Sequence, residues 1–558
     1  MAKIDEQIAQ AAKTLEQQPG NAHLWLRLGM MQRHNNDFVG AINSFTRCVA
    51  VDAGAAKAWL YIGFCFLDLF KLKEALDSFE FVLQIAPHEG EALFGLAVVR
   101  ECMGEHEKAL AMLDQAIALE PEHPQFYAYR ASLRATHGRD PALTLASFRQ
   151  WAERFADPLT AAAAPLSPER TPGRRLRIGY VSADLRDHAV AYFVEPVFAR
   201  HDRANFEICV FSSGSEDHVT ARIRPTVDHW FDVSAMDDTQ VYSLIRRQKI
   251  DVLIDLSGHS RGNRLLAFAR RAAPVQATWL GYMYTTGMRA MDYRITDAII
   301  DPPGLVEAGH AESLFRLQSI AVYQPPADTP LPAPPMISRG GVALASLNHL
   351  KKVTDGMLLV WRRILEALPQ ASLTLISAER TAQEALARQG GRLAGLGLPL
   401  ERVRILPRMP MDEFMRMGSS IDIALDTAPL SGGTTTLHSL WMGLPVVCMA
   451  GEQAFEASTA SAMLALGYAE LVAQDADGYV TAAVALAQSP QRVADFRNGV
   501  RARMGQSRLM DYGAFVRDLE ASFRLMWLNY LNGERHYLHT GYDLQREISA
   551  CKALPRAA

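Results

Sequence analysis

The chain has 558 residues, 49% of them hydrophobic and 21% charged, which exceeds what one hydrophobic core usually holds and predicts about three to four domains. Its 57 Lys and Arg against 61 Asp and Glu give a formal net charge of -4, which argues against nucleic acid or a membrane surface as a partner. No apolar leader and no run of about 18 uncharged apolar residues occurs, so we expect a cytoplasmic protein.

The first quarter of the chain carries an internal repeat with a period of 34 residues. A large apolar residue recurs at this spacing, and a small residue follows it within each repeat. The two series are Trp25, Trp59, Leu93 and Tyr127, and Gly29, Gly63, Ala97 and Ala131. The pattern resembles the tetratricopeptide family, in which small residues let paired helices pack closely. We predict a repeat superhelix over residues 1–156, with a degenerate half-repeat and a degenerate repeat at its ends.

A superhelix of this kind is curved, and its concave face can hold a peptide or another subunit. The repeats are also consistent with a purely architectural role, so acceptor binding in the groove and a homodimer both stay open. Residues 157–174 are rich in Pro and Ala and are predicted to form a linker.

Beyond the linker, short apolar runs alternate with helical segments. The runs lie at 176–182, 206–213, 251–258, 275–282 and 293–300, and then at 342–348, 372–377, 403–407, 421–426 and 445–451. This alternation predicts parallel sheets with crossover helices, in two Rossmann-like lobes at 175–335 and 336–513. Ligands of such sheets bind beyond the carboxyl ends of the strands. In the C-terminal segment 514–558, residues 514–531 predict a helix that crosses back to the first lobe.

One stretch of the second lobe, Asp426 to Pro445, reads as a strand, a Ser-Gly-Gly turn and the start of a helix. The first-turn amides of a helix lack internal partners, and Thr434 and Thr435 add hydroxyl donors. Gly432 and Gly433 let the backbone approach a ligand closely. We interpret the stretch as a cradle for a nucleotide diphosphate, with an ordinary loop and a capped helix as the alternative.

Polar residues follow other predicted strands. His188 lies just past the first strand, where a structural role is the alternative to a catalytic one. The second-lobe segment SLNHLKKVTD places Asn348, His349, Lys351 and Lys352 at the opening of a helix, where the dipole disfavours lysine. An anion nearby would explain this placement, and a solvated surface lysine is the alternative.

Several kinds of site are not indicated. The chain has no DxD carboxylate pair in a loop and neither of the motifs GxxxxGK[ST] and GxGxxG, and its six cysteines lack the spacing of a zinc or redox motif. We therefore expect no metal and no cofactor, with the phosphates neutralised by Lys, Thr and backbone amides.

Together, the repeats and the motifs RIGYVSADLRDHAVAYF, APVQATWLGYMYTTG, SLNHLKK and LDTAPLSGGTTTLHSLWMGLPVV resemble the O-linked N-acetylglucosamine transferase family over nearly the whole chain. The resemblance implies an α/β protein with an N-terminal all-α repeat domain and two lobes of the GT-B type. It also implies a metal-independent, inverting transfer of N-acetylglucosamine from UDP-N-acetylglucosamine to Ser or Thr of proteins.

Matching motifs imply roles for individual residues. His188 falls at the family's active-site histidine, and Lys352 at its diphosphate-binding lysine. The remaining positions implied to bind the nucleotide sugar are Leu280, Gly281, Asn348, His349, Met409, Phe414, Gly433, Thr434, Thr435 and His438. Either His188 or a donor phosphate is the base that accepts the proton of the attacking hydroxyl.

Some positions depart from the animal enzymes of this family. Gly433 replaces a histidine, His438 replaces the aspartate that binds ribose, and Met411 and Phe414 replace a lysine and a histidine beside uracil. Phe414 can still stack on a base. These changes leave two alternatives open: a related protein glycosyltransferase that uses GDP-fucose or UDP-glucose, and a weakened repeat scaffold that only binds nucleotide.

Overall fold

The computed structural model describes residues 2–137, 140–327, 329–377, 379, 381–451 and 454–533. The chain divides into two compact units. One comprises Met1–Leu133 with Ser377–Arg388, and the other comprises Arg134–Ile376 with Gln389–Ala558. The first unit holds the repeats, and the second holds both α/β lobes.

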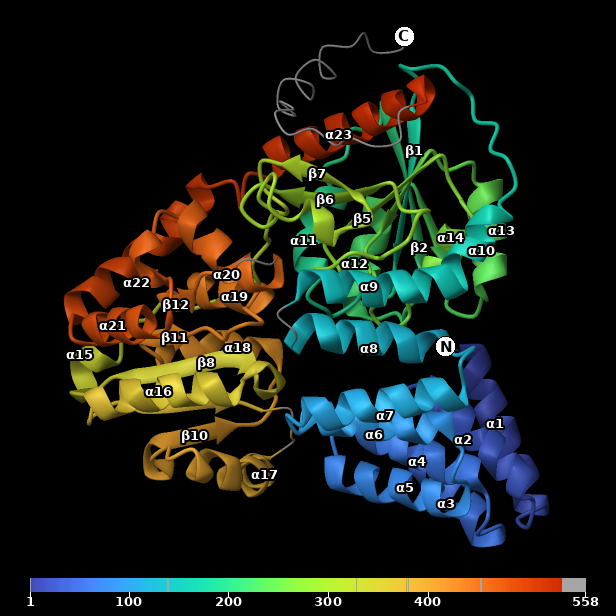
Figure 1. Ribbon diagram of the computed structural model, residues 1–558, viewed down its shortest axis with the longest axis horizontal. Helices are drawn as coiled ribbons and strands as arrows, with labels where there is room; N and C mark the ends of the chain where they lie inside the picture. Colours follow the sequence, from blue (N-terminus) through green and yellow to red (C-terminus); the bar gives the residue numbers. More distant parts are fainter. Residues whose placement is uncertain are drawn as a thin grey trace. The chain divides into compact units, whose positions relative to one another are not determined.

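The first unit consists of helix pairs that follow the 34-residue repeat of the sequence (Figure 1). The helices are α1 (Ala2–Gln17), α2 (Ala22–His34), α3 (Phe38–Val51), α4 (Ala56–Asp68), α5 (Leu72–Ile85), α6 (Gly90–Cys102), α7 (His106–Leu119) and α8 (Pro124–His137). A Cβ atom on Gly29 would lie 2.5 Å from the Phe45 ring, and one on Gly63 would lie 2.6 Å from the Phe79 ring. Glycine at these two positions is therefore needed for the aromatic residue of the paired helix to pack, and the predicted repeat fold is confirmed.

The N-terminal lobe contains a seven-stranded parallel sheet in the order β3-β2-β1-β4-β5-β6-β7. Its strands are β1 (Leu176–Ser182), β2 (Phe206–Ser212), β3 (His229–Asp232), β4 (Val252–Asp255), β5 (Val275–Trp279), β6 (Tyr293–Asp297) and β7 (Ser313–Leu317). The helices of this part are α9 (Pro141–Trp151), α10 (Asp157–Ala161), α11 (Ala191–Phe198), α12 (His218–Ile223), α13 (Asp238–Arg247) and α14 (Leu265–Ala269). Helix α10 thus opens the segment predicted as a linker.

The C-terminal lobe repeats this strand order with six parallel strands, β10-β9-β8-β11-β12-β13. The strands are β8 (Ala343–His349), β9 (Ser372–Ile376), β10 (Val403–Leu406), β11 (Ile423–Leu425), β12 (Val446–Met449) and β13 (Val472–Ala473). The helices are α15 (Met336–Arg339), α16 (Asp355–Ala367), α17 (Ala382–Gly395), α18 (Met411–Arg416), α19 (Thr434–Trp441), α20 (Ala454–Ala465), α21 (Ala476–Ala487) and α22 (Pro490–Gln506). The strand order reverses between β1 and β4 and between β8 and β11, which is where such sheets bind ligands.

The last described helix, α23 (Tyr512–Asn532), returns to the N-terminal lobe as predicted (Figure 1). Its residues Phe515, Leu519 and Phe523 share one buried cluster with the strands of that lobe. The Glu520 carboxylate accepts a hydrogen bond from His201 at 2.9 Å. The contact between α23 and the N-terminal lobe therefore also includes a buried hydrogen bond. Residues 534–558, including the predicted tail, lie outside the described residues.

Three strands were missing from the sequence prediction. Strand β3 is an exposed edge strand, and its sequence HWFD has no continuous apolar run. Strand β7 is also an edge strand, and β13 has two residues. Buried strands produce apolar runs, whereas short edge strands need not. Within the described residues, no helix combines the length and apolar character needed to cross a bilayer.

Candidate functional site

The carboxyl ends of β8 and β11 bring five residues together: Asn348, Lys352, Asp426, Ser431 and Gly432. We call them the β8/β11 cluster. The Lys352 ammonium donates a hydrogen bond to the carbonyl oxygen of Ser431 at 3.0 Å. The Asn348 amide donates to Oδ1 of Asp426 at 2.8 Å, and the backbone N–H of Gly432 donates to the same oxygen at 2.8 Å. The lysine and the glycine-rich turn predicted to act together are therefore in contact.

The charges of this cluster are largely removed from water. Burial lowers the pKa of the Lys352 ammonium to about 8, and the nearby Asp426 carboxylate opposes this change. Burial also raises the pKa of Asp426, against the effect of its hydrogen bonds and of Lys352. A second negative charge placed beside Lys352 would stabilise the protonated amine. The cluster is therefore suited to an anion.

Helix α19 starts at this cluster, with Gly433 as its N-cap and Thr434 as its first residue. Among the described residues, neither the Thr434 nor the Thr435 hydroxyl has a hydrogen-bond partner, and both residues are half-buried. A Cβ atom on Gly432 would lie 2.3 Å from Oγ1 of Thr436, so the turn depends on glycine there. Free amides, free hydroxyls and the positive end of the helix dipole converge on one place, as anion binding requires.

One detail of the lysine segment differs from the prediction. Lys352 belongs to a short 3-10 turn, Leu350–Lys352, and α16 begins only at Asp355 after its N-cap Thr354. The helix dipole therefore does not make this position unusual for a lysine. The position is unusual because the lysine side chain is buried near Asp426. His349 caps the turn, because its Nδ1 accepts a hydrogen bond from the Lys351 N–H at 3.1 Å.

The loop after β5 approaches the same cluster from the N-terminal lobe. Leu280 has a φ of 69°, a left-handed conformation that is rare for a residue with a side chain and is often found at functional sites. A Cβ atom on Gly281 would lie 1.7 Å from the carbonyl oxygen of Leu256, so two loops touch there. The Tyr284 ring lies 4.9 Å from the Phe455 ring, and the Phe455 carbonyl accepts a hydrogen bond from the Ser431 N–H at 3.0 Å. Tyr284 and Phe455 therefore connect the loop after β5 to the β8/β11 cluster.

His188 follows β1, as predicted, with 41% of its side chain exposed. Its Nδ1 accepts a hydrogen bond from the Val190 N–H at 3.3 Å, so the neutral ring carries its proton on Nε2. Nε2 lies 4.0 Å from Oδ1 of Asp184. Partial burial lowers the pKa of His188, and Asp184 opposes this change. The ring is therefore neutral at pH 7 and has a donor to offer.

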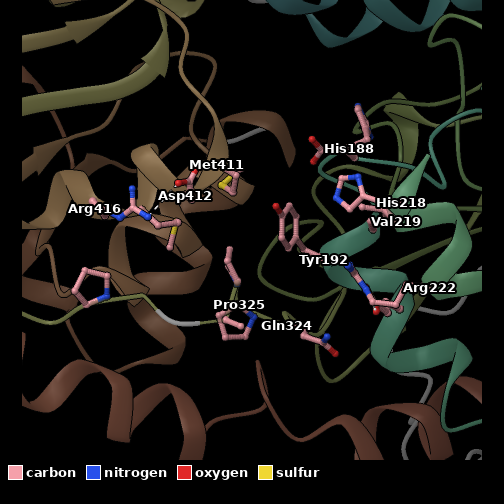
Figure 2. A pocket seen from close by; sticks show the side chains of 17 residues that line it. His188, Tyr192, His218, Val219, Arg222, Gln324, Pro325, Met411, Asp412 and Arg416 are labelled. Atoms are coloured by element: carbon pink, nitrogen blue, oxygen red, sulfur yellow. Dashed lines mark hydrogen bonds and ion pairs between the residues drawn. The ribbon is translucent and has the colours of Figure 1, made fainter. Parts of the chain in front are cut away.

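His188 lines a cavity of about 640 Å³ formed by both lobes. In Figure 2, His188, Tyr192, His218 and Arg222 of the N-terminal lobe face Met411, Asp412 and Arg416 of the C-terminal lobe, with Gln324 and Pro325 between them. Lys352, Thr434 and Thr435 are not among the described residues that line it. Within the described residues, the structure thus has a charged cavity at His188, and the β8/β11 cluster at Lys352 is separate from it.

His438 of α19 connects these two places. It is buried, its Nδ1 is hydrogen bonded to the Tyr323 hydroxyl at 2.7 Å, and burial lowers its pKa to about 4. Its ring contacts those of Tyr192, which lines the cavity, and Phe414 of α18. The imidazole is therefore neutral and packed among aromatic rings that come from both lobes. Met409, Met411 and Phe414 are half-buried around the start of α18.

Sequence reasoning missed two kinds of residue at this site. Asp426 is the first residue of the predicted diphosphate cradle, but no function was predicted for it. Its position, shortly before a glycine-rich turn, is the sequence feature that could have indicated one. Tyr192 and Tyr323 were not predicted because nothing in their local sequence indicates which residues they meet across the lobes.

Comparisons with known proteins agree with this architecture. The profile of glycosyl transferase family 41 matches residues 161–319 and 337–519, and a tetratricopeptide repeat profile matches residues 66–133. A solved structure of a Thermobaculum terrenum O-GlcNAc transferase variant is 33% identical, with a TM-score of 0.86, and the match covers 92% of this chain and 98% of that one.

Curated plant proteins are similar as well. A tomato protein named probable UDP-N-acetylglucosamine--peptide N-acetylglucosaminyltransferase SPINDLY is 38% identical over 69% of this chain and 42% of its own length. An Arabidopsis thaliana protein named SEC, with the same enzyme name, is 27% identical over 73% of this chain and 44% of its own. The chain thus spans less than half the length of these relatives.

Proposed function

Because the chain belongs to glycosyl transferase family 41, we propose that it transfers a sugar from a nucleoside diphosphate sugar to Ser or Thr hydroxyls of proteins. The observation that supports this proposal best is the Lys352 ammonium bonded to the Ser431 carbonyl at the turn that opens α19. Cleaving the bond between sugar and phosphate leaves negative charge on the diphosphate. A cation and free helix-terminal amides stabilise that charge as it develops.

The proposed assignments follow from this arrangement. Lys352 and the amides and hydroxyls of Thr434 and Thr435 hold the diphosphate, with no metal required for its charge. The backbone of Leu280 and Gly281 lies on the sugar side, since that loop reaches the cluster through Phe455. Activity that persists in excess EDTA is expected under this proposal, and loss of activity restored by Mg²⁺ would contradict the metal-independent part of it.

For the donor we propose UDP-N-acetylglucosamine, with the base resting near Met409 and Phe414. His438 occupies the position implied to contact ribose, where its neutral ring can offer a hydrogen bond but no charge. GDP-fucose and UDP-glucose are the alternatives. A thermal-shift panel of UDP, GDP and their sugars on the full chain, followed by transfer onto a peptide library, tests the proposal. Stabilisation by UDP with transfer supports it, stabilisation by GDP favours the fucose donor, and no response favours a scaffold.

We propose that the acceptor is a protein segment presented by the repeat groove, and that the enzyme works in the cytoplasm. Removing the repeats and measuring transfer to a short peptide and to a folded protein tests the first point. A larger loss for the folded protein is expected. The homodimer is tested by the mass of the full chain in solution.

Gly432 provides a test of the diphosphate site. Gly432→Ala places a Cβ atom 2.3 Å from the buried Thr436 hydroxyl and 3.0 Å from Asp426. Overpacking of this kind costs about 1–3 kcal/mol. Where the turn relieves the clash by leaving its binding conformation, we expect UDP affinity to fall by up to about 5- to 150-fold. Calorimetric titration of this variant and the wild type checks this, and equal affinities would contradict the placement of UDP at this turn.

A further inference from the structure

We propose that Asp426 is a positioning residue that holds the phosphate-binding turn in shape beside the Lys352 ammonium, an inference that rests on the proposed function. Asp426 is 3% exposed and lies directly after β11. Its Oδ1 accepts hydrogen bonds from the Gly432 N–H and the Asn348 amide, each at 2.8 Å. One carboxylate oxygen thus ties the glycine turn to the end of β8.

The buried Thr459 hydroxyl lies near this carboxylate but donates to the Gly432 carbonyl at 2.9 Å, so among the described residues the other carboxylate oxygen is left without a partner. Within the described part of the chain, Oδ2 of Asp426 and Oδ1 of Asn348 are buried acceptors with no hydrogen-bond partner. Leaving such atoms unpaired is costly, more so for a charged group, so they are retained only where something offsets the cost. The Lys352 ammonium compensates at longer range: among the described residues its hydrogen bond is to Ser431, and its charge attracts the Asp426 carboxylate without a hydrogen bond or ion pair between them.

The charged and titratable groups that face this pair are few among the described residues. Lys351 repels the Lys352 charge, and Asp426 attracts it. Cys448 and Tyr479 face Asp426 from β12 and α21, and burial raises the pKa of each far above 9. Both stay neutral between pH 7 and 9.5. A change in the charge of the cluster over this range therefore comes from Lys352.

This arrangement has a consequence for the dependence of binding on pH. In the free protein, the pKa of Lys352 is about 8, and a bound diphosphate raises it. Diphosphate affinity is therefore fully present below pH 8 and falls as pH rises above it, by up to about tenfold per pH unit. Replacing the Asp426 carboxylate by an amide removes a charge that raises the pKa of Lys352, so diphosphate affinity begins to fall at a lower pH.

The experiment is a calorimetric titration of the full chain with UDP, and in parallel with GDP, at intervals from pH 7 to 9.5. Asp426→Asn is expected to move the onset of the fall in affinity to lower pH by about one unit. Lys352→Arg, which stays protonated throughout, is expected to give an affinity that no longer changes with pH, both alone and combined with Asp426→Asn.

Structural damage alone would scale the affinity without moving its pH dependence. An Asp426→Asn profile that runs parallel to the wild type would overturn the inference while leaving the proposed function intact. Should Asp426→Asn fail to fold, Asp426→Glu decides: its longer side chain displaces the carboxylate from the Gly432 N–H, so UDP affinity at pH 7 is expected to fall, and wild-type affinity would overturn the inference. If the wild type binds neither nucleotide at any pH, both the proposed function and this inference fall.

Discussion

Replacing Lys352 by methionine is expected to lower sugar transfer by about 10²- to 10³-fold and to abolish stabilisation of the protein by UDP. Methionine keeps the length and apolar character of the side chain but removes the ammonium that lies against the Ser431 carbonyl. Losing one preorganised donor aimed at developing charge costs about 3–4 kcal/mol in well-studied enzymes. Initial rates with saturating donor, together with UDP-dependent thermal shifts, measure both effects.

Lys351 provides the control for this experiment. It is the neighbouring lysine in the same 3-10 turn, but its side chain is exposed, so Lys351→Met removes the same formal charge from the solvent side. We expect its rate and UDP affinity to stay within a few-fold of the wild type, because exposed charges contribute little. Equal losses in the two variants would mean that only the overall charge matters, and that Lys352 has no direct contact with the diphosphate.

Much of this fold could be predicted from the sequence because the signals are local. A period of 34 residues with Gly29 and Gly63 opposite Phe45 and Phe79 identifies helix pairs, and apolar runs identify the buried strands. Edge strand β3 carries no such signal, since one side of it faces solvent. Periodicity and apolar runs therefore predicted the repeat helices and the buried strands, but not the short strands at the edges of the sheets.

The candidate site could be predicted only in part, for a related reason. Lys352 and the Gly-Gly-Thr turn were identifiable because their residue types suit a phosphate. The burial of Asp426 was not, because a carboxylate at the end of a strand is as compatible with solvent as with a buried contact to β8. The contact between Tyr323 and His438 depends on how two lobes meet, which no local pattern encodes.

His188→Ala is expected to lower transfer by about 10²- to 10⁴-fold while leaving UDP affinity unchanged, because His188 lies at the cavity and Lys352, the proposed diphosphate ligand, lies in the separate β8/β11 cluster. His218→Ala is the matched control. That histidine lines the same cavity from α12, and we expect near wild-type transfer from its variant. Loss of UDP binding in His188→Ala, or full activity, would remove His188 from the proposed mechanism.

The tautomer of His188 allows its role to be tested further. Its Nδ1 accepts from the Val190 N–H, so the neutral ring presents an N–H at Nε2. Under the proposed function we expect this N–H to orient an acceptor or sugar oxygen rather than take its proton. Gln places an amide donor near the same position, so His188→Gln should recover part of the activity lost in His188→Ala. A base would instead require a neutral ring with free Nε2, and activity would then fall with decreasing pH through the lowered pKa of His188. Initial rates of the wild type and His188→Gln from pH 5 to 8 separate the two roles, because a donor works in both protonation states. No recovery in His188→Gln, together with a wild-type rate that falls in acid, would assign His188 as the base.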